Sequence, residues 1–151
     1  MPNGFNGKIL RVDLSAKKIT TEEYPESFYR LYYGGEGLVG YFLLKEVPRK
    51  ADPLGPDNKL IFAAGPLTGV PAGGCGRHSV GAKSPLTNSF GEAEAGGYWG
   101  AELKFTGFDA IVVEGKSEEP VYLLVQDGKA ELRDARHLWG KFSKETQEEI
   151  R

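Results

Sequence analysis

Polar and apolar side chains alternate at the beginning of the chain. Residues 7–14 alternate in this way, and residues 18–24 follow after the short segment 15–17. Alternation over about 4–8 residues is typical of a strand with one buried face. Two such runs joined by a short turn predict a β-hairpin.

The pattern then changes to helical spacing. Phe28, Leu31 and Tyr32 recur three and four residues apart before the glycine pair 34–35, and a second helical pattern runs from 38 to 45. Apolar residues at this spacing predict two short helices that are separated by the glycines.

Short apolar runs bounded by turn residues predict the remaining strands. They are residues 59–64, 77–83, 89–93, 109–114, 121–125 and 129–133. Turn residues at 114–116 and 127–129 join the last three of these into a predicted meander. Short helices are predicted at 98–105 and at 143–151, where Ser143 precedes an acidic first turn.

These elements predict an α+β fold with barrel-like or open, mostly antiparallel sheets and short helices. A doubly wound sheet is excluded because the strands lack regular helical crossovers. The chain stops within the predicted helix 143–151 without a C-cap. We therefore expect a truncated domain, a fragment of a longer protein.

Composition narrows the class of protein. One cysteine in 151 residues excludes a disulfide framework, a Cys-rich zinc site and an iron-sulfur cluster held within this chain. Lys and Arg total 19 against 21 acidic residues, without a basic run, so we expect no nucleic-acid partner and no membrane partner. No apolar stretch has the length of a membrane helix, and residues 1–4 do not resemble a signal peptide, so we expect a cytoplasmic protein.

Glycine is concentrated in one segment. Residues 65–107 hold eleven of the 21 glycines, although they make up little more than a quarter of the chain. Glycine loses the most backbone freedom on folding, so it is costly in helices and strands. Its density here indicates a backbone that packs closely against another group, and a ligand is one candidate.

Two features of this segment suit an anion. Arg77 follows a glycine-rich loop and offers a planar fork of five donors to a phosphate or a flat heterocycle, although a surface ion pair is its commoner role. The pair Gly96-Gly97 opens a predicted helix whose first amides have no intrahelical acceptor. Tight packing is the alternative role for these two glycines.

Weaker candidates have plainer explanations. Glu92 and Glu94 would share one face of a strand, where they suit acid–base chemistry or a hard cation, but a solvated face is favoured. Cys75 would need a base such as His78 to act as a nucleophile, and a small filler is favoured. The motif at 35–40 matches G-x-G-x-x-G but follows a helical pattern instead of a strand, which favours a helix-to-helix turn.

Aromatic side chains near the predicted helix 98–105 could stack on a ring ligand. Tyr98, Trp99, Phe105 and Phe108 are the residues concerned, and core packing is their usual role. His137 is expected to be an ordinary packed or surface histidine. No complete catalytic set is visible, so the local chemistry leads only to a glycine-rich cradle for an anionic cofactor.

Four longer motifs stand in order along the chain. They are AAGPLTG at 63–69, GAKSPLT at 81–87, GGYWGAELK at 96–104 and GFDAIVVEG at 107–115. Together with segments 4–14 and 134–140, they resemble the N-terminal domain of tungsten-containing aldehyde:ferredoxin oxidoreductases. The resemblance covers nearly the whole chain.

The resemblance implies a cofactor in which two pyranopterins hold tungsten (or molybdenum) and Mg²⁺ bridges their phosphates. Carried over by position, Arg77 would lie against the pterin. Glu94, Ala95 and Gly96 would meet the phosphates and Mg²⁺ through backbone groups. Family members can carry asparagine where this chain has Glu94, and a carboxylate beside phosphates is repulsive, so we expect only its main-chain carbonyl to take part. No residue of this chain is expected to be catalytic or to ligate a metal through its side chain.

The resemblance also implies a reaction. Such enzymes oxidise an aldehyde substrate to a carboxylic acid and pass the electrons through a [4Fe-4S] cluster to ferredoxin, and the cluster belongs to later domains. Residues 1–151 would then be the N-terminal part of the tungstopterin-binding domain, which needs the remaining domains or subunits and is inactive alone. The alternatives are a benzoyl-coenzyme A reductase type catalytic subunit of the same superfamily and a cofactor-free interaction or scaffold domain.

Overall fold

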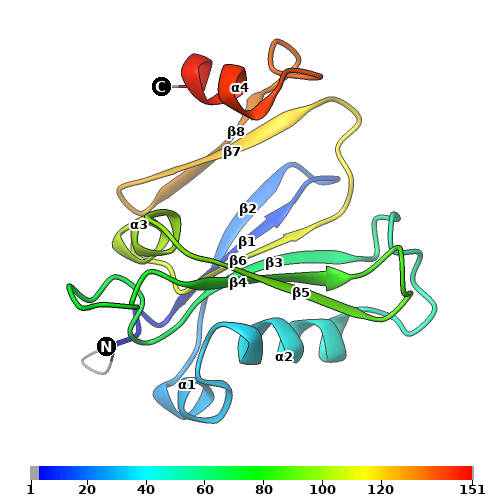
Figure 1. Cartoon of the computed structure of the whole chain (residues 1–151). Helices are drawn as coiled ribbons and strands as arrows, with labels where there is room; N and C mark the ends of the chain where they lie inside the picture. Colours follow the sequence, from blue (N-terminus) through cyan, green and yellow to red (C-terminus); the bar gives the residue numbers. More distant parts are fainter. Residues whose placement is uncertain (1–3, 151) are drawn as a thin grey trace.

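The structure is a computed structural model that describes residues 4–150. In this range a six-stranded sheet has the order β2-β1-β6-β3-β4-β5, and β7 and β8 form a separate two-stranded sheet (Figure 1). The strands are β1 (Lys8–Asp13), β2 (Lys18–Glu23), β3 (Lys59–Ala64), β4 (His78–Lys83), β5 (Phe90–Ala95), β6 (Ala110–Glu114), β7 (Val121–Gln126) and β8 (Lys129–Asp134). The helices are α1 (Glu26–Tyr32), α2 (Glu36–Glu46), α3 (Trp99–Phe105) and α4 (Ser143–Ile150).

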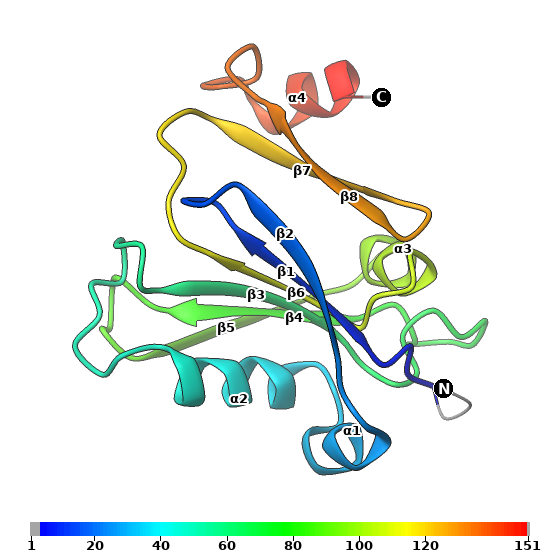
Figure 2. The ribbon, with the colours of Figure 1, turned by 180° about the vertical axis from the view of Figure 1, so that it is seen from behind.

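The six-stranded sheet is covered on both faces. Helices α1 and α2 lie on one face, and α3 and the β7–β8 hairpin lie on the other, with α4 beyond the hairpin (Figures 1 and 2). Tyr29 and Phe42 from the helices pack with Ile61 on the first face. On the second face, Leu103 of α3 and Leu123 of β7 join a cluster around the sheet. The predicted α+β class is confirmed, with an open sheet in which β1–β6 is parallel and the other paired strands are antiparallel.

The predicted meander is wrong. β6 lies between β1 and β3 in the large sheet, while β7 pairs with β8 alone. The physical reason is burial. Ala110, Ile111 and Val112 are all buried, so β6 needs cover on both faces and takes a central position. The half-buried β7 suits the smaller outer sheet.

The other predicted elements are present, with ends that differ by one or two residues. β4 begins at His78 instead of Arg77, and β5 continues to Ala95. Residues 1–3, which belong to the segment that does not resemble a signal peptide, and Arg151, which ends the last predicted helix, lie outside the described residues. Within residues 4–150, no helix has both the length and the apolar character needed to span a bilayer.

A cluster of charged residues joins five elements at one face of the sheet. Arg11 of β1 bonds Glu46 of α2 at 2.8 Å and Glu114 of β6 at 3.2 Å, and it pairs with Glu22 of β2 at 2.8 Å. Lys59 of β3 pairs with Glu46 and Glu114. Burial opposes the charge on Arg11, but its bonds to Glu46 and Glu22 raise its pKa overall. Burial likewise opposes ionisation of Glu46, whose pKa is nevertheless lowered by Arg11. Arg11 and Glu46 are thus held in their charged forms, and the ion pairs tie β1, β2, β3, β6 and α2 together.

Candidate functional site

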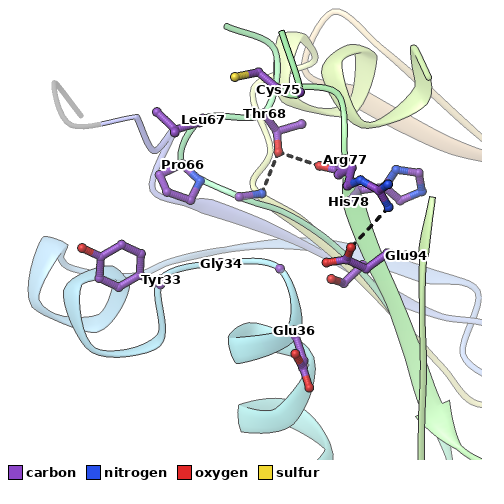
Figure 3. Close-up of a pocket in the computed structure, with 14 residues that line it drawn as sticks. Tyr33, Gly34, Glu36, Pro66, Leu67, Thr68, Cys75, Arg77, His78 and Glu94 are labelled. Carbon is purple, nitrogen blue, oxygen red and sulfur yellow. Dashed lines mark hydrogen bonds and ion pairs between the residues drawn. The ribbon is translucent and has the colours of Figure 1, made fainter. Parts of the chain in front are cut away.

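A cavity of about 470 Å³ lies where the glycine-rich loops meet the beginning of α2 (Figure 3). Its lining comes from residues 33–36, 65–68, 74–75, 77–79 and 94. The first segment joins α1 to α2, and the second follows β3. Residues 74–75 lie in the loop before β4, residues 77–79 include the start of β4, and residue 94 lies on β5. The cavity therefore forms between segments that are far apart in the sequence, and it includes part of the glycine-rich segment.

The turn between α1 and α2 forms one wall. Gly34 has φ +103°, and a Cβ there would lie 2.6 Å from the carbonyl oxygen of Ala64. Only glycine fits this close approach. The Gly35 amide donates to the same carbonyl oxygen at 3.1 Å, which fixes the start of α2 against the end of β3. The G-x-G-x-x-G motif at 35–40 therefore follows a helix instead of a strand, as the preceding pattern favoured, and it comprises the N-cap and the first residues of α2.

Thr68 connects the two loops that face this turn. Its side chain is buried, and its Oγ1 accepts from the Gly65 amide at 2.9 Å and donates to the Arg77 carbonyl at 2.8 Å (Figure 3). The loop after β3 is thereby bonded to the residue that precedes β4. Thr68 was not singled out in the sequence, although it lies in the motif at 63–69.

A buried ion pair between Lys104 and Asp109 also holds the loop after β3. Lys104 of α3 donates through Nζ to the Gly65 carbonyl at 3.1 Å and to Asp109 Oδ1 at 2.7 Å. Asp109 is fully buried, and it also accepts from the backbone amides of Asn6 and Gly7 at 2.9 and 2.7 Å. These bonds tie the first described residues, α3 and the site loop into one unit. Sequence reasoning missed both residues, because an Asp and a Lys on neighbouring elements carry no local pattern.

The structure brings Arg77 and Glu94 together. Arg77 Nη1 donates to Glu94 Oε2 at 3.4 Å, and the two side chains are 66% and 52% exposed (Figure 3). Both residues line the cavity. Ala95 pairs with His78 in the β4–β5 ladder and, like Gly96, is exposed at the end of β5 without lining the cavity.

His78 and Cys75 do not form a catalytic dyad. The His78 ring packs against Trp99 in a tilted arrangement with 4.5 Å between ring centroids, and Cys75 Sγ contacts the Gly73 carbonyl at 3.9 Å. His78 is 7% exposed, and burial lowers its pKa, so the ring is neutral at pH 7. Its Nδ1 has no hydrogen-bond partner among residues 4–150 and lies 3.1 Å from the place where a Cβ on Gly100 would stand. The ring therefore packs tightly against the start of α3.

Two further candidates, Glu92 and Glu94, lie on β5. Glu92 and Glu94 share one face of β5, opposite Gly81 and Ser79, as their spacing predicted. Within residues 4–150, no group of three or more His, Cys, Asp or Glu side chains is placed to hold a metal ion.

Of the four aromatic residues, Phe108 alone is buried in the core. Tyr98 and Phe105 are 87% and 68% exposed, while Trp99 packs on Phe62 and His78. His137 is a surface residue.

The charge on the cavity lining is mixed. The lining holds one cation, Arg77, and two carboxylates, Glu36 and Glu94, of which Glu94 contacts Arg77, while His78 is neutral. The backbone is open at Gly74 in the lining and at Gly73, Gly96 and Gly97 beside it, because no atom lies within 4 Å of a Cβ built on them. The site thus offers one planar cation, open space beside the backbone of several glycines, and two carboxylates against one guanidinium.

Comparison with known proteins defines the class. The sequence profile of the aldehyde ferredoxin oxidoreductase N-terminal domain matches residues 9–151. The chain belongs to this family.

Individual relatives agree with the profile. The chain is 54% identical over 145 residues to the tungsten-containing aldehyde ferredoxin oxidoreductases of Thermococcus kodakarensis and Pyrococcus furiosus. It is 39% identical over 158 residues to an aliphatic sulfonate oxidoreductase, WOR-like subunit, of Pyrococcus furiosus. These alignments cover 96–97% of this chain and 24–25% of the relatives. The chain therefore spans about a quarter of their length.

The fold also occurs among solved structures. One example is the active site complex BamBC of benzoyl coenzyme A reductase in complex with 1,5-dienoyl-CoA, which superposes with a TM-score of 0.95 at 43% identity. The match covers 99% of this chain and 23% of that chain. The same domain thus occurs in proteins named for different reactions.

Proposed function

We propose that this chain forms one side of the pterin site of a cytoplasmic tungsten oxidoreductase that converts aldehydes to carboxylic acids and passes electrons to ferredoxin. The observation that carries the proposal is the 54% identity to tungsten-containing aldehyde ferredoxin oxidoreductases over 96% of the chain. Residues 65–68 of the cavity lining belong to the motif at 63–69 that carries the resemblance, and Arg77 lies between that motif and the next. Residues 1–151 would be the N-terminal part of the cofactor-binding domain.

The residues of the cavity fit a pterin that carries a phosphate. The Arg77 guanidinium can donate to phosphate oxygens or to ring acceptors of the pterin. The open glycines at 73–74 and 96–97 let a flat group approach the backbone, and a side chain at these positions would narrow that approach. The carboxylates of Glu36 and Glu94 would repel a phosphate unless a cation offsets them, which supports a role for Mg²⁺.

Within this site the chain would bind and orient the cofactor. When bound, the tungsten–pterin group supplies the two-electron chemistry with water as the oxygen source, and the protein supplies positioning and electrostatics. Arg77 is held in position through its carbonyl by Thr68. Glu94, Ala95 and Gly96 would contact the phosphates and Mg²⁺ through main-chain groups. A main-chain role for Glu94 is expected because its carboxylate would repel the phosphate oxygens.

The [4Fe-4S] cluster and the substrate pocket would belong to the part of the enzyme beyond this chain. A benzoyl-coenzyme A reductase type subunit is the second candidate, which the TM-score of 0.95 favours. The higher identity to the aldehyde oxidoreductases supports the first candidate. A cofactor-free scaffold would require a protein that takes up neither metal nor pterin with all its domains present.

The proposal is tested on protein purified anaerobically from its native source, by metal analysis, pterin fluorescence after oxidation and intact mass. Tungsten and iron with about two pterins per tungsten are expected in a longer polypeptide. Arg77→Gln should lower the pterin content, whereas Arg133→Gln, in the exposed pair with Glu131, should not. A complete protein without tungsten and pterin would overturn the proposal.

A further inference from the structure

Arg77 is the cation on which anion binding in the cavity depends. Among the described residues that line the cavity, it is the lone arginine or lysine, and the two carboxylates are Glu36 and Glu94. One of these carboxylates already bonds the guanidinium. The arrangement of the ion pair therefore affects any oxyanion that enters.

The Arg77–Glu94 contact is single and long. It joins Nη1 to Oε2 at 3.4 Å, between side chains that are 66% and 52% exposed. Exposed pairs of this kind add little to folding stability, because water solvates both partners well. A guanidinium binds a phosphate best through two parallel N–H donors. A bond at Nη1 to Glu94 takes one of the donors that such a fork requires.

We propose that the Glu94 carboxylate competes with an incoming oxyanion for Arg77, so that Glu94 sets the affinity of the cavity for phosphate-type anions. Two effects act in the same direction. The bond to Glu94 must break before both guanidinium nitrogens can face the ligand, and the carboxylate then stands close to a second anion. The class of ligand rests on the proposed function, but the competition itself does not require tungsten or a pterin.

Cys75 supplies a direct readout of this competition. It is the one cysteine in the sequence, and it lines the same cavity two residues before Arg77. Its thiolate attacks a disulfide reagent, forms a mixed disulfide and releases one thiolate. We would use the complete protein without its cofactor and follow the modification of Cys75 by peptide mass spectrometry, because the part beyond this chain is expected to hold further cysteines. We would measure the rate with dianionic dithiobis(nitrobenzoate) and the rate with neutral dithiodipyridine, and take their ratio. The ratio cancels differences in the ionisation and the accessibility of the thiol.

Glu94→Gln keeps the size of the side chain and removes its charge. With Arg77 released, the rate ratio of anionic to neutral reagent should rise about three- to tenfold. The matched control is Glu36→Gln, which removes the same charge from the same cavity but not from a partner of Arg77. It should change the ratio less than about twofold. Inorganic pyrophosphate, used as a competitor, should protect Cys75 at about three- to tenfold lower concentration in Glu94→Gln.

A double-mutant cycle separates competition from simple repulsion. In the Arg77→Gln background, Glu94→Gln should change the ratio less than about twofold. An equal rise with and without Arg77, or an equal rise in Glu36→Gln, would show general repulsion and overturn the proposal. Glu94→Asp provides a second variant in case Glu94→Gln fails to fold. It keeps the charge but shortens the reach to Arg77, so competition predicts a rise and repulsion predicts none.

The two proposals fail in different ways. A complete protein that lacks tungsten and pterin refutes the proposed function, whereas the Cys75 measurements need neither group. Equal effects of Glu94→Gln in the two backgrounds refute competition, even if the complete protein holds the cofactor.

Discussion

Thr68→Val tests whether one hydroxyl fixes Arg77 in the site. Valine matches the shape of threonine closely, so the change removes Oγ1 without creating a cavity. Two backbone groups then lose their partner, the Gly65 amide at 2.9 Å and the Arg77 carbonyl at 2.8 Å. The predicted effect is therefore that of two unsatisfied polar groups, with no loss of packing.

The magnitude follows from the burial of these groups. An unsatisfied buried group costs about 1–3 kcal/mol, and because Gly65 is half-buried and Arg77 is exposed, each backbone group belongs near the lower end. The expected loss is about 2 kcal/mol of unfolding free energy. For a chain of this size, that loss lowers Tm by about 4–8 °C.

Thermal unfolding followed by circular dichroism measures the effect, and hydrogen exchange at the Gly65 amide locates it. Thr68→Ser keeps the hydroxyl and should retain the protection of that amide. Thr21→Val, at an exposed position of β2, should change stability by less than about 0.5 kcal/mol. The reasoning would be refuted if Thr68→Val matched Thr21→Val in Tm and left the Gly65 amide protected.

Three further predictions concern the support of the site. Lys104→Met leaves the fully buried Asp109 carboxylate without its cation and should cost about 3–5 kcal/mol in urea unfolding; a loss below about 1 kcal/mol would contradict a buried ion pair. Gly34→Ala should lower Tm, because φ is +103° and a Cβ would lie 2.6 Å from a carbonyl oxygen. Its control is Gly40→Ala in α2, where a Cβ has open space, and this change should raise the free energy of unfolding by up to about 1 kcal/mol. Burial lowers the pKa of His78 below 6.5, so the unfolded chain binds its proton more readily and stability falls as pH drops below about 6.5. His78→Phe should remove that part of the Tm-against-pH curve, and an unchanged curve would refute it.

The local elements follow directly from the sequence. The hairpin β1–β2 formed as its alternation predicted, and so did the β7–β8 hairpin, whose turn residues Asp127 and Gly128 both have positive φ. These features depend on neighbours along the chain, so a short window of sequence contains the whole signal. The meander failed for the opposite reason. β6 finds its partners in β1 and β3, far from it in sequence.

The candidate site also has features that the local sequence predicted and features that depend on distant residues. The glycine density of 65–107 and the donor fork of Arg77 pointed to a cradle for an anion, and the structure places Arg77 in a cavity with the neighbouring loops. The roles of Glu94, Ala95 and Gly96 toward a cofactor stay predictions. The pairing of Glu94 with Arg77 could not be predicted, because the side chains meet only when β4 and β5 lie in register.

The sequence by itself determined the type and position of the helices and strands, the family and the glycine-rich segment that supplies most of the cavity lining. The tertiary structure decided the strand order, the cover on each face of the sheet and the network behind Arg77. That network depends on contacts such as Gly7 with Asp109, 102 residues apart, and Lys104 with the Gly65 carbonyl, 39 residues apart. Such bonds form only after the sheet has closed the loops between them, so no local pattern of residues encodes them.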